Sequence, residues 1–193
     1  MKIYRTLKNY KVTKSIVTVG TFDGVHKGHA KILNTLISET RSFGGESVVF
    51  TLYPHPRKVL FPKEKEIFLL NTIEEKIELL EKSGVDNLII YPFTNEFAQL
   101  TSCDFIERIL YNKLNVKQLI VGFDHRFGKD RQGNLEILRN CANPFGFDII
   151  KVNALEHKGE KISSSRIRNS IISGEVEKAN FYLGYDYFIK PFL

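Results

Sequence analysis

Short runs of β-branched and aliphatic residues alternate along this chain with segments whose apolar residues recur at helical spacing. The runs predict five strands, near residues 15–19, 47–53, 87–91, 117–121 and 147–152. The helical spacing predicts helices near residues 30–43, 73–83, 105–110, 134–142, 165–173 and 175–183. This alternation predicts an α/β fold, with a parallel sheet covered by helices on both faces.

Unusual polar or glycine-rich segments follow three of the predicted strands. Ligands of parallel sheets bind beyond the carboxyl ends of the strands, so these segments are the first candidates for a site. They cover residues 20–29, 51–57 and 121–128, and a serine-rich segment at 161–168 joins them. The proline-rich stretch at 54–62 is predicted to be a long loop.

The first segment, Gly20–His29, lies between a strand and a helix. A helix start presents free N–H groups and the positive end of the helix dipole, which suits a phosphate. His26 and His29 are three residues apart at this entry, so both imidazoles can face one phosphate. Neither GxxxxGK[ST] nor GxGxxG is present. A glycine-rich turn with two surface histidines stays open, as does a zinc site that would need two more ligands.

The second segment holds His55 between two prolines, Pro54 and Pro56, just before Arg57. Prolines stiffen a loop and so hold a side chain for binding at little entropic cost. A stiff surface turn without function is the alternative.

The third segment combines glycines, aromatic residues and charges. Phe123 and Phe127 could pack against a planar ligand ring. Asp124 could accept hydrogen bonds from a ring or ribose, and Arg126 could bind a phosphate. The alternative places one or both phenylalanines in the core.

The fourth segment opens a helix with Ser163, Ser164 and Ser165. One serine serves as the N-cap, and the others can supply hydroxyl donors beside free N–H groups. Arg168 falls one turn into this helix and could clamp a triphosphate. A simple capped helix is the alternative.

Composition narrows the class of protein. The chain has 193 residues, of which 42% are hydrophobic and 26% charged, which predicts one globular domain. No apolar run is long enough to span a membrane, and the start resembles no signal peptide. The net charge of +6 is scattered, which favours small phosphorylated ligands over nucleic acid. Cys103 and Cys141 are expected to be unpaired buried fillers in a reducing cytoplasm.

Taken in order, these segments resemble the nucleotidylyltransferases, enzymes that transfer a nucleotidyl group and release pyrophosphate. Gly20–His29 is similar to their HxGH signature, and Ile162–Arg168 to their second ATP signature. Residues 51–57, 70–76, 122–128 and 174–184 resemble, more specifically, the FMN adenylyltransferase domain of bacterial FAD synthetases. The resemblance runs from about Ser15 to Tyr187. It implies a Rossmann-like fold of the nucleotidylyltransferase type over residues 1–187, with 188–193 as a tail.

The resemblance also implies roles for the motif residues. ATP, FMN and Mg²⁺ would be bound and FAD released, with Mg²⁺ held mainly by the ATP phosphates. His26, His29 and Arg168 would be catalytic. The expected ATP- and phosphate-binding residues are Gly20, Phe22, Asp23, Gly24, Gly28, Arg126, Ser163, Ser164 and Ser165. The expected flavin-binding residues are His55, Pro56, Arg57, Phe123, Asp124 and Phe127.

The chain departs from the family pattern in two ways. His125 stands where the family usually has Phe, on the expected flavin side. No segment resembles the riboflavin kinase domain that usually follows. FMN would therefore come from another protein, or from another part of a longer one.

Three other functions are compatible with parts of the sequence. Another nucleotidylyltransferase would use a pantetheine, nicotinamide or polyol phosphate as acceptor. A non-catalytic flavin or nucleotide binder would keep the pocket alone. An RNA-binding module is suggested only by the basic charge.

Overall fold

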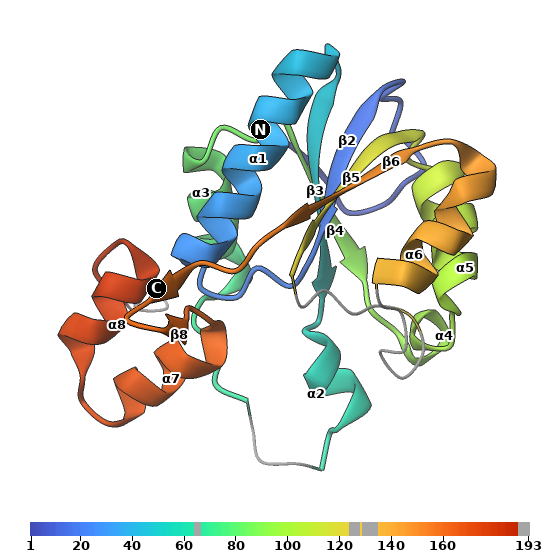
Figure 1. Cartoon of the computed structure of the whole chain (residues 1–193). Coiled ribbons are helices and arrows are strands. Elements are labelled where there is room, and N and C mark those ends of the chain that lie inside the picture. Colours follow the sequence, from blue (N-terminus) through green and yellow to red (C-terminus); the bar gives the residue numbers. More distant parts are fainter. Residues whose placement is uncertain (64–66, 124–127, 129–134, 189–193) are drawn as a thin grey trace.

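We describe the chain from a computed structural model, which describes residues 1–63, 67–123, 128 and 135–188. A six-stranded parallel sheet forms its centre (Figure 1). Its strands are β1 (Lys2–Tyr4), β2 (Ser15–Val19), β3 (Glu46–Tyr53), β4 (Asn87–Pro92), β5 (Val116–Gly122) and β6 (Asp148–Val152). They lie in the order β1-β4-β3-β2-β5-β6. The predicted α/β fold with a parallel sheet is confirmed.

Helices cover both faces of the sheet, as the sequence predicted. In Figure 1, α1 (Lys27–Phe43) and α3 (Ile73–Lys82) lie on one face. The opposite face carries α5 (Ser102–Phe105) and α6 (Leu135–Ala142). The remaining elements are α2 (Pro56–Leu60), α4 (Asn95–Ala98), the π-helix η1 (Ile106–Tyr111), the 3₁₀ turn η3 (Asn143–Phe145), the hairpin strands β7 (Glu156–His157) and β8 (Glu160–Lys161), α7 (Ser164–Ile172) and α8 (Val176–Leu183).

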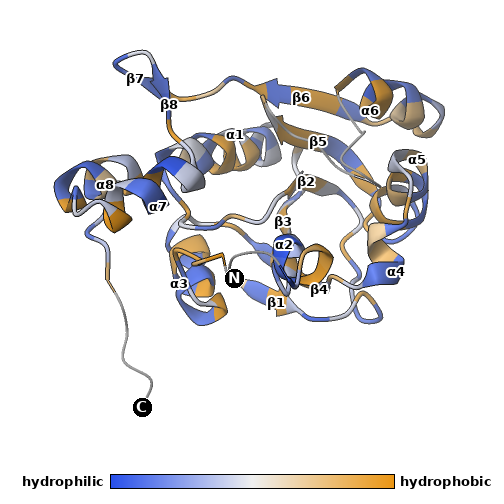
Figure 2. Cartoon of the chain, turned by 90° about the horizontal axis from the view of Figure 1, so that it is seen from below, coloured by the Kyte–Doolittle hydropathy of each residue, from blue (hydrophilic) through white to orange (hydrophobic). Residues whose placement is uncertain are grey.

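Alternation along the strands builds a core on each face. On β3, Val48 and Phe50 join the cluster under α5, η1 and α6, whereas Val49 joins the cluster under α1 and α3. Side chains that alternate between the faces of a strand produce this division. A third, smaller cluster packs α7 and α8 against Leu70. Figure 2 shows the apolar sides of α1 and α3 turned toward the sheet.

Two elements differ from the expectations. The stretch 54–62 was predicted as a loop but contains the helix α2. Pro56 occupies the first turn of α2, where the missing N–H costs nothing, so proline does not exclude a helix there. The strand β1 was not predicted, because three residues with one aliphatic side chain carry almost no periodicity.

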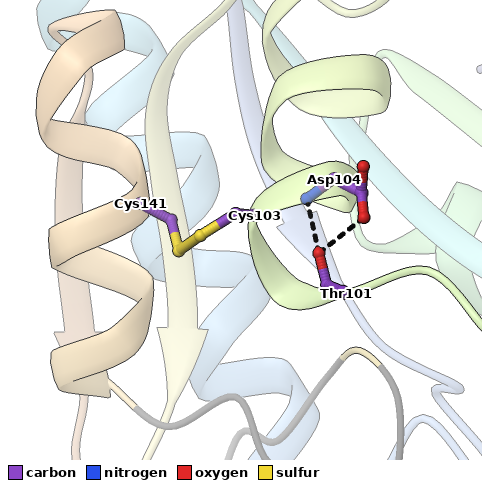
Figure 3. The surroundings of a disulfide bond; sticks show 4 residues. All are labelled: Thr101, Cys103, Asp104 and Cys141. Carbon is purple, nitrogen blue, oxygen red and sulfur yellow. Dashed lines mark hydrogen bonds between the residues drawn. A yellow bond between two sulfur atoms is a disulfide. The ribbon is translucent and has the colours of Figure 1, made fainter.

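The two cysteines also differ from the expectation of unpaired buried fillers. Cys103 on α5 and Cys141 on α6 form a disulfide with Cα atoms 5.1 Å apart (Figure 3). Cys103 is exposed, whereas Cys141 is buried. The pair lies 38 residues apart in the chain, and each cysteine faces the other only once both helices dock on the sheet. Composition alone could not reveal that pairing.

Among the described residues, no helix combines the length and apolar character needed to cross a bilayer.

Candidate functional site

The order of the strands reverses beside β2. From β2 the sheet continues to β3 and β4 on one side and to β5 and β6 on the other. In open α/β sheets, ligands bind at such a switch point, beyond the carboxyl ends of the strands. The segment Gly20–His29 leaves β2 at this point, and Phe123 follows β5 beside it. The topology therefore brings the first predicted segment and the start of the third, up to Phe123, to one edge.

His26 and His29 lie face to face at the start of α1. Their rings stack with centroids 3.7 Å apart and an interplanar angle of 14°. His26 is the N-cap of α1, and its Nδ1 accepts a hydrogen bond from the backbone N–H of His29 at 3.2 Å. Because Nδ1 accepts, the proton of the neutral ring sits on Nε2 and can be donated to a ligand. The ring of Phe22, buried in the core, lies 5.0 Å from His29 and supports it.

Two glycines make this arrangement possible. Gly28 lies so close to His26 that a Cβ there would be 3.1 Å from the imidazole. Gly24 has a φ of +84°, and a Cβ there would approach Leu70 to 2.6 Å. Any side chain at either position would displace the turn or the ring. Gly24 and Gly28 thus shape the segment.

Asp23 connects the β2–α1 turn to two distant segments. Its carboxylate is only 2% exposed and accepts a hydrogen bond from the backbone N–H of Leu70 at 2.9 Å. It also pairs with the guanidinium of Arg168 at 3.0 Å. The predicted catalytic Arg168 is therefore held against the histidine segment by a buried ion pair.

The three serines at the start of α7 have distinct partners. Ser163 is the N-cap and accepts from the backbone N–H of Arg166. Ser164 donates to the backbone carbonyl of Asp23 at 2.9 Å. Ser165 is exposed and accepts from Arg168 at 3.4 Å. These contacts direct the N-terminus of α7 toward the start of α1, so two helix dipoles meet at one place.

His55 repeats the geometry of His26 on a neighbouring strand. It follows β3, caps α2, and its Nδ1 accepts from the backbone N–H of Arg57 at 3.2 Å. Pro56 forms the first turn of α2, and Arg57 is exposed. Because β3 pairs in parallel with β2, His55 follows the strand end next to the β2–α1 segment, and the charges of Asp23 and Arg168 act on its pKa.

The end of β5 is described only in part. Phe123 lies under the ammonium group of Lys161, which is 4.4 Å from the ring centroid. Asp124, Arg126 and Phe127, together with His125, fall outside the described residues. Their assignment to the flavin and phosphate groups stays a prediction.

Three residues at the candidate site were not identified by the sequence analysis. Asn71, Lys76 and Tyr185 lie around Asp23, although residues 70–76 were assigned no role. The Tyr185 hydroxyl donates to the backbone carbonyl of Gly24 at 2.6 Å. Burial raises the pKa of Tyr185 to about 12, so it stays a donor. The capping-box pattern at Thr72 signalled only a helix start.

Burial keeps the imidazoles neutral in the ligand-free site. Desolvation lowers the pKa of His26 and of His55 to about 4, although the negative charge of Asp23 opposes both shifts. Desolvation, and then the charges of His26 and Lys76, hold the pKa of His29 well below its ordinary value. At neutral pH these three rings are uncharged, and each keeps one N–H that can be donated to a ligand.

Several buried polar atoms at the site lack a partner among the described residues. They are His29 Nδ1, Asn71 Nδ2 and Arg168 Nε. A buried polar group without a partner costs free energy, and a native structure keeps one for a reason. The amide and guanidinium groups are donors, and a neutral imidazole can donate as well. Such a set suits an anion rich in oxygen acceptors, such as a phosphate.

The described residues offer no carboxylate cage for a metal ion. No group of three or more His, Cys, Asp or Glu side chains gathers within them. Asp23 is buried here, and its two oxygens already bind Leu70 and Arg168. Mg²⁺ commonly binds through phosphate oxygens and water with only one or two carboxylates. The donor set therefore fits phosphates rather than a metal held by protein alone.

Fold and site together define an α/β protein of the nucleotidylyltransferase type, with buried hydrogen-bond donors gathered at the switch point of its sheet. A sequence model described as FAD synthetase matches residues 8–166. The chain belongs to the FAD synthetase family.

Individual relatives agree with this family. A bifunctional riboflavin kinase/FMN adenylyltransferase of Buchnera aphidicola subsp. Schizaphis graminum is 34% identical over 98% of this chain and 62% of its own length. One of Bacillus subtilis is 35% identical over 92% of this chain and 55% of its own. The chain thus spans little more than half the length of these relatives.

A solved structure shares the fold and part of the sequence. It is described as a macrolide-efflux protein from Streptococcus pneumoniae, with a TM-score of 0.83 and 30% identity. The match covers 95% of this chain and 61% of that one. The described site gives no argument for transferring an efflux activity to this chain.

Proposed function

We propose that this chain is an FMN adenylyltransferase, which converts ATP and FMN to FAD and pyrophosphate. The observation that carries the proposal is the stacked pair of neutral imidazoles at the start of α1, opposite the N-terminus of α7 and Arg168. Membership of the FAD synthetase family, and similarity to bifunctional riboflavin kinase/FMN adenylyltransferases, support FMN as the acceptor.

The reaction needs no nucleophile from the protein. An oxygen of the FMN phosphate attacks the α-phosphorus of ATP and forms a new P–O bond. The bond from that phosphorus to the oxygen bridging the α- and β-phosphates breaks, and pyrophosphate leaves with the electron pair. Negative charge grows on the leaving group and on the α-phosphate oxygens, so catalysis consists of alignment and charge stabilisation.

This chain's residues match those two tasks. The Nε2–H of His26 and the ring N–H of His29, stacked on it, would donate to the α-phosphate oxygens. Arg168 and the N–H groups at the start of α7 would hold the leaving pyrophosphate. Asp23 orients Arg168 and stays out of the chemistry. Mg²⁺ would be held by the ATP phosphates and would add further charge neutralisation.

The flavin would lie across the ends of β3 and β5. His55, Pro56 and Arg57 lie on the β3 side, and Phe123 on the β5 side. We assign no riboflavin kinase activity to these residues. FMN would have to be supplied by a kinase on another polypeptide or on a further part of the same one.

The test is to incubate the purified chain with FMN, ATP and Mg²⁺ and to separate the flavins by chromatography. We expect FAD from FMN, and no FMN from riboflavin in a parallel reaction. Bound FMN without FAD would indicate a flavin-binding domain instead. Neither binding nor turnover with FMN would redirect the search to pantetheine, nicotinamide and polyol phosphates.

Replacing His29 tests the proposed chemistry. We expect His29→Ala to lower kcat by about 10²–10³-fold, because it removes a donor to the reacting phosphate. His157→Ala, on β7, is the matched control and should keep full turnover. Circular dichroism checks that both variants fold. Near wild-type turnover of His29→Ala would refute the role of His29.

A further inference from the structure

Lys76 is a buried cation that the proposed mechanism does not use. It lies in the first half of α3 and is only 6% exposed. Within the described part of the chain, its ammonium group makes no ion pair and no hydrogen bond. Taking an ammonium group out of water without a partner costs several kcal/mol, on the order expected for any buried ion. A folded chain keeps such a group for a reason.

The surroundings of Lys76 hold two buried carboxylates, Asp23 and Glu75, and one further cation, Arg168. The ammonium group and Asp23 attract each other, and Asp23 already pairs with Arg168. Asp23 thus faces two cations. The neighbouring Glu75 caps its own helix by accepting from the backbone N–H of Thr72. Because Asp23 is already taken by Leu70 and Arg168, and Glu75 by its own helix start, the ammonium group of Lys76 is left to meet an anionic ligand.

The position of Lys76 indicates which of the two substrates' phosphates it would bind. Leu70 binds Asp23, and Tyr185 contacts both Gly24 and Asn71, so the segment leading into α3 lies against the β2–α1 turn. From α3, the charge of Lys76 acts on both His29 and His55. Figure 2, which views the sheet from its carboxyl edge, shows α3 between α7 and α2. The leaving group would be held at α7. In an in-line displacement the acceptor phosphate lies opposite the leaving group, so it needs a cation other than Arg168 to hold it.

We propose that Lys76 binds the phosphate monoester of the acceptor and positions it for attack on ATP. The inference rests on the proposed function and deepens it by naming the group that recognises the phosphate. Asn71, 5% exposed and five residues earlier, has an amide nitrogen without a partner and supplies a second donor. An ammonium group acts as a compact point charge, which suits a phosphate dianion that must keep a free oxygen for attack.

The experiment compares two flavins that differ only in the phosphate. Binding of FMN and of riboflavin is titrated by flavin fluorescence, and ATP binding by calorimetry. We expect Lys76→Met to weaken FMN binding by about 10- to 100-fold, as for loss of a charged hydrogen bond, and to leave riboflavin and ATP binding unchanged. Lys76→Arg should restore most of the FMN affinity. Lys82→Met, an exposed lysine of the same helix, is the matched control and should change nothing.

Three results would overturn the inference. Equal weakening of FMN and riboflavin binding would make Lys76 a structural residue. Weakening of ATP binding alone would assign it to the nucleotide. Unchanged binding of all three ligands would remove it from the site. Should Lys76→Met fail to fold by circular dichroism, Lys76→Gln and Lys76→Arg give the same comparison between FMN and riboflavin.

The design separates this inference from the proposed function. A wild-type chain that forms no FAD, yet prefers FMN to riboflavin through Lys76, would refute the enzyme and keep the phosphate site. A wild-type chain that forms FAD, with a preference for FMN that survives Lys76→Met, would keep the enzyme and refute the role of Lys76.

Discussion

Two regions of this molecule bury opposite kinds of side chain. Under α5, η1 and α6, a continuous apolar cluster packs against the sheet, and the Cys103–Cys141 disulfide joins two of these helices. At the switch point, polar and charged residues such as Asp23, His26 and Lys76 are buried instead, and some of their neighbours lack partners. We call these two regions the apolar side and the polar edge.

The difference shows that the apolar side stabilises the fold, whereas the buried polar groups of the polar edge lower the stability. Each buried apolar side chain on the apolar side contributes about 1.5–3 kcal/mol. The polar edge buries groups that would be better solvated in water unless a ligand completes their hydrogen bonds. Ligand binding should therefore stabilise the polar edge far more than the apolar side.

The largest expected effect comes from Asp23. Replacing it by Asn removes the charge that compensates Arg168 and Lys76 inside the protein. We expect the free energy of unfolding to fall by about 3–5 kcal/mol, as when one partner of a buried ion pair is lost. Urea denaturation measures it. A loss below about 1 kcal/mol, as for an exposed pair, would show that the polar edge is open to water.

The disulfide should give the next largest effect, on the apolar side. It closes a loop of 38 residues, so its reduction should lower the free energy of unfolding by about 2–4 kcal/mol. FAD formation at saturating substrate should not change, because the pair lies away from the histidines. Urea denaturation with and without dithiothreitol measures the first effect. Two titratable thiols in the denatured, unreduced protein would contradict the pairing.

Acid should weaken the polar edge selectively. The pKa of His26 is about 4 in the folded chain and near 6.5 when unfolded. The unfolded chain binds more protons between these values, so the free energy of unfolding falls as the pH is lowered through this window. His26 alone should contribute about 1–2 kcal/mol between pH 7 and pH 5. Urea denaturation at both pH values should show a shallower dependence for His26→Asn; an identical dependence would contradict this account.

The smallest effect is expected from the second ion pair of α7. Arg166 pairs with Glu160, and their side chains are 37% and 46% exposed, whereas those of Arg168 and Asp23 are 14% and 2% exposed. Water and salt screen such a pair. Glu160→Gln should leave the thermal midpoint unchanged within error. A loss as large as that of Asp23→Asn would remove the distinction between exposed and buried pairs.

Periodicity predicted most of the fold because most elements are long enough to repeat. The strands β2, β3, β4, β5 and β6 and the helices α1, α3, α6, α7 and α8 were expected within a few residues of their observed bounds. The three-residue β1 and the two-residue strands β7 and β8 carry too few positions for a pattern to emerge. The helix α2 was not predicted, because the prolines around it were interpreted as evidence for a loop.

The site was predictable where its functional residues lie close together in the sequence. His26 and His29 are three residues apart, and their pairing follows from the turn of one helix. Lys76 and Tyr185 reach the same place from distant segments, and a lysine in a helix or a tyrosine after one carries no signal of its own. Asp23 was expected at the site, but its pairing with Arg168, which is 145 positions away, could not be predicted from the sequence.

The contacts of the β2–α1 turn have a consequence for how the molecule opens. Backbone or side-chain atoms of Asp23 and Gly24 bind Leu70, Ser164, Arg168 and Tyr185. The C-terminal helices α7 and α8 are thus tied to the turn. They should exchange their amide hydrogens with solvent as one cooperative unit with the turn. A ligand bound at the turn would slow that exchange in helices more than a hundred residues away along the chain, with no contact of its own to α8.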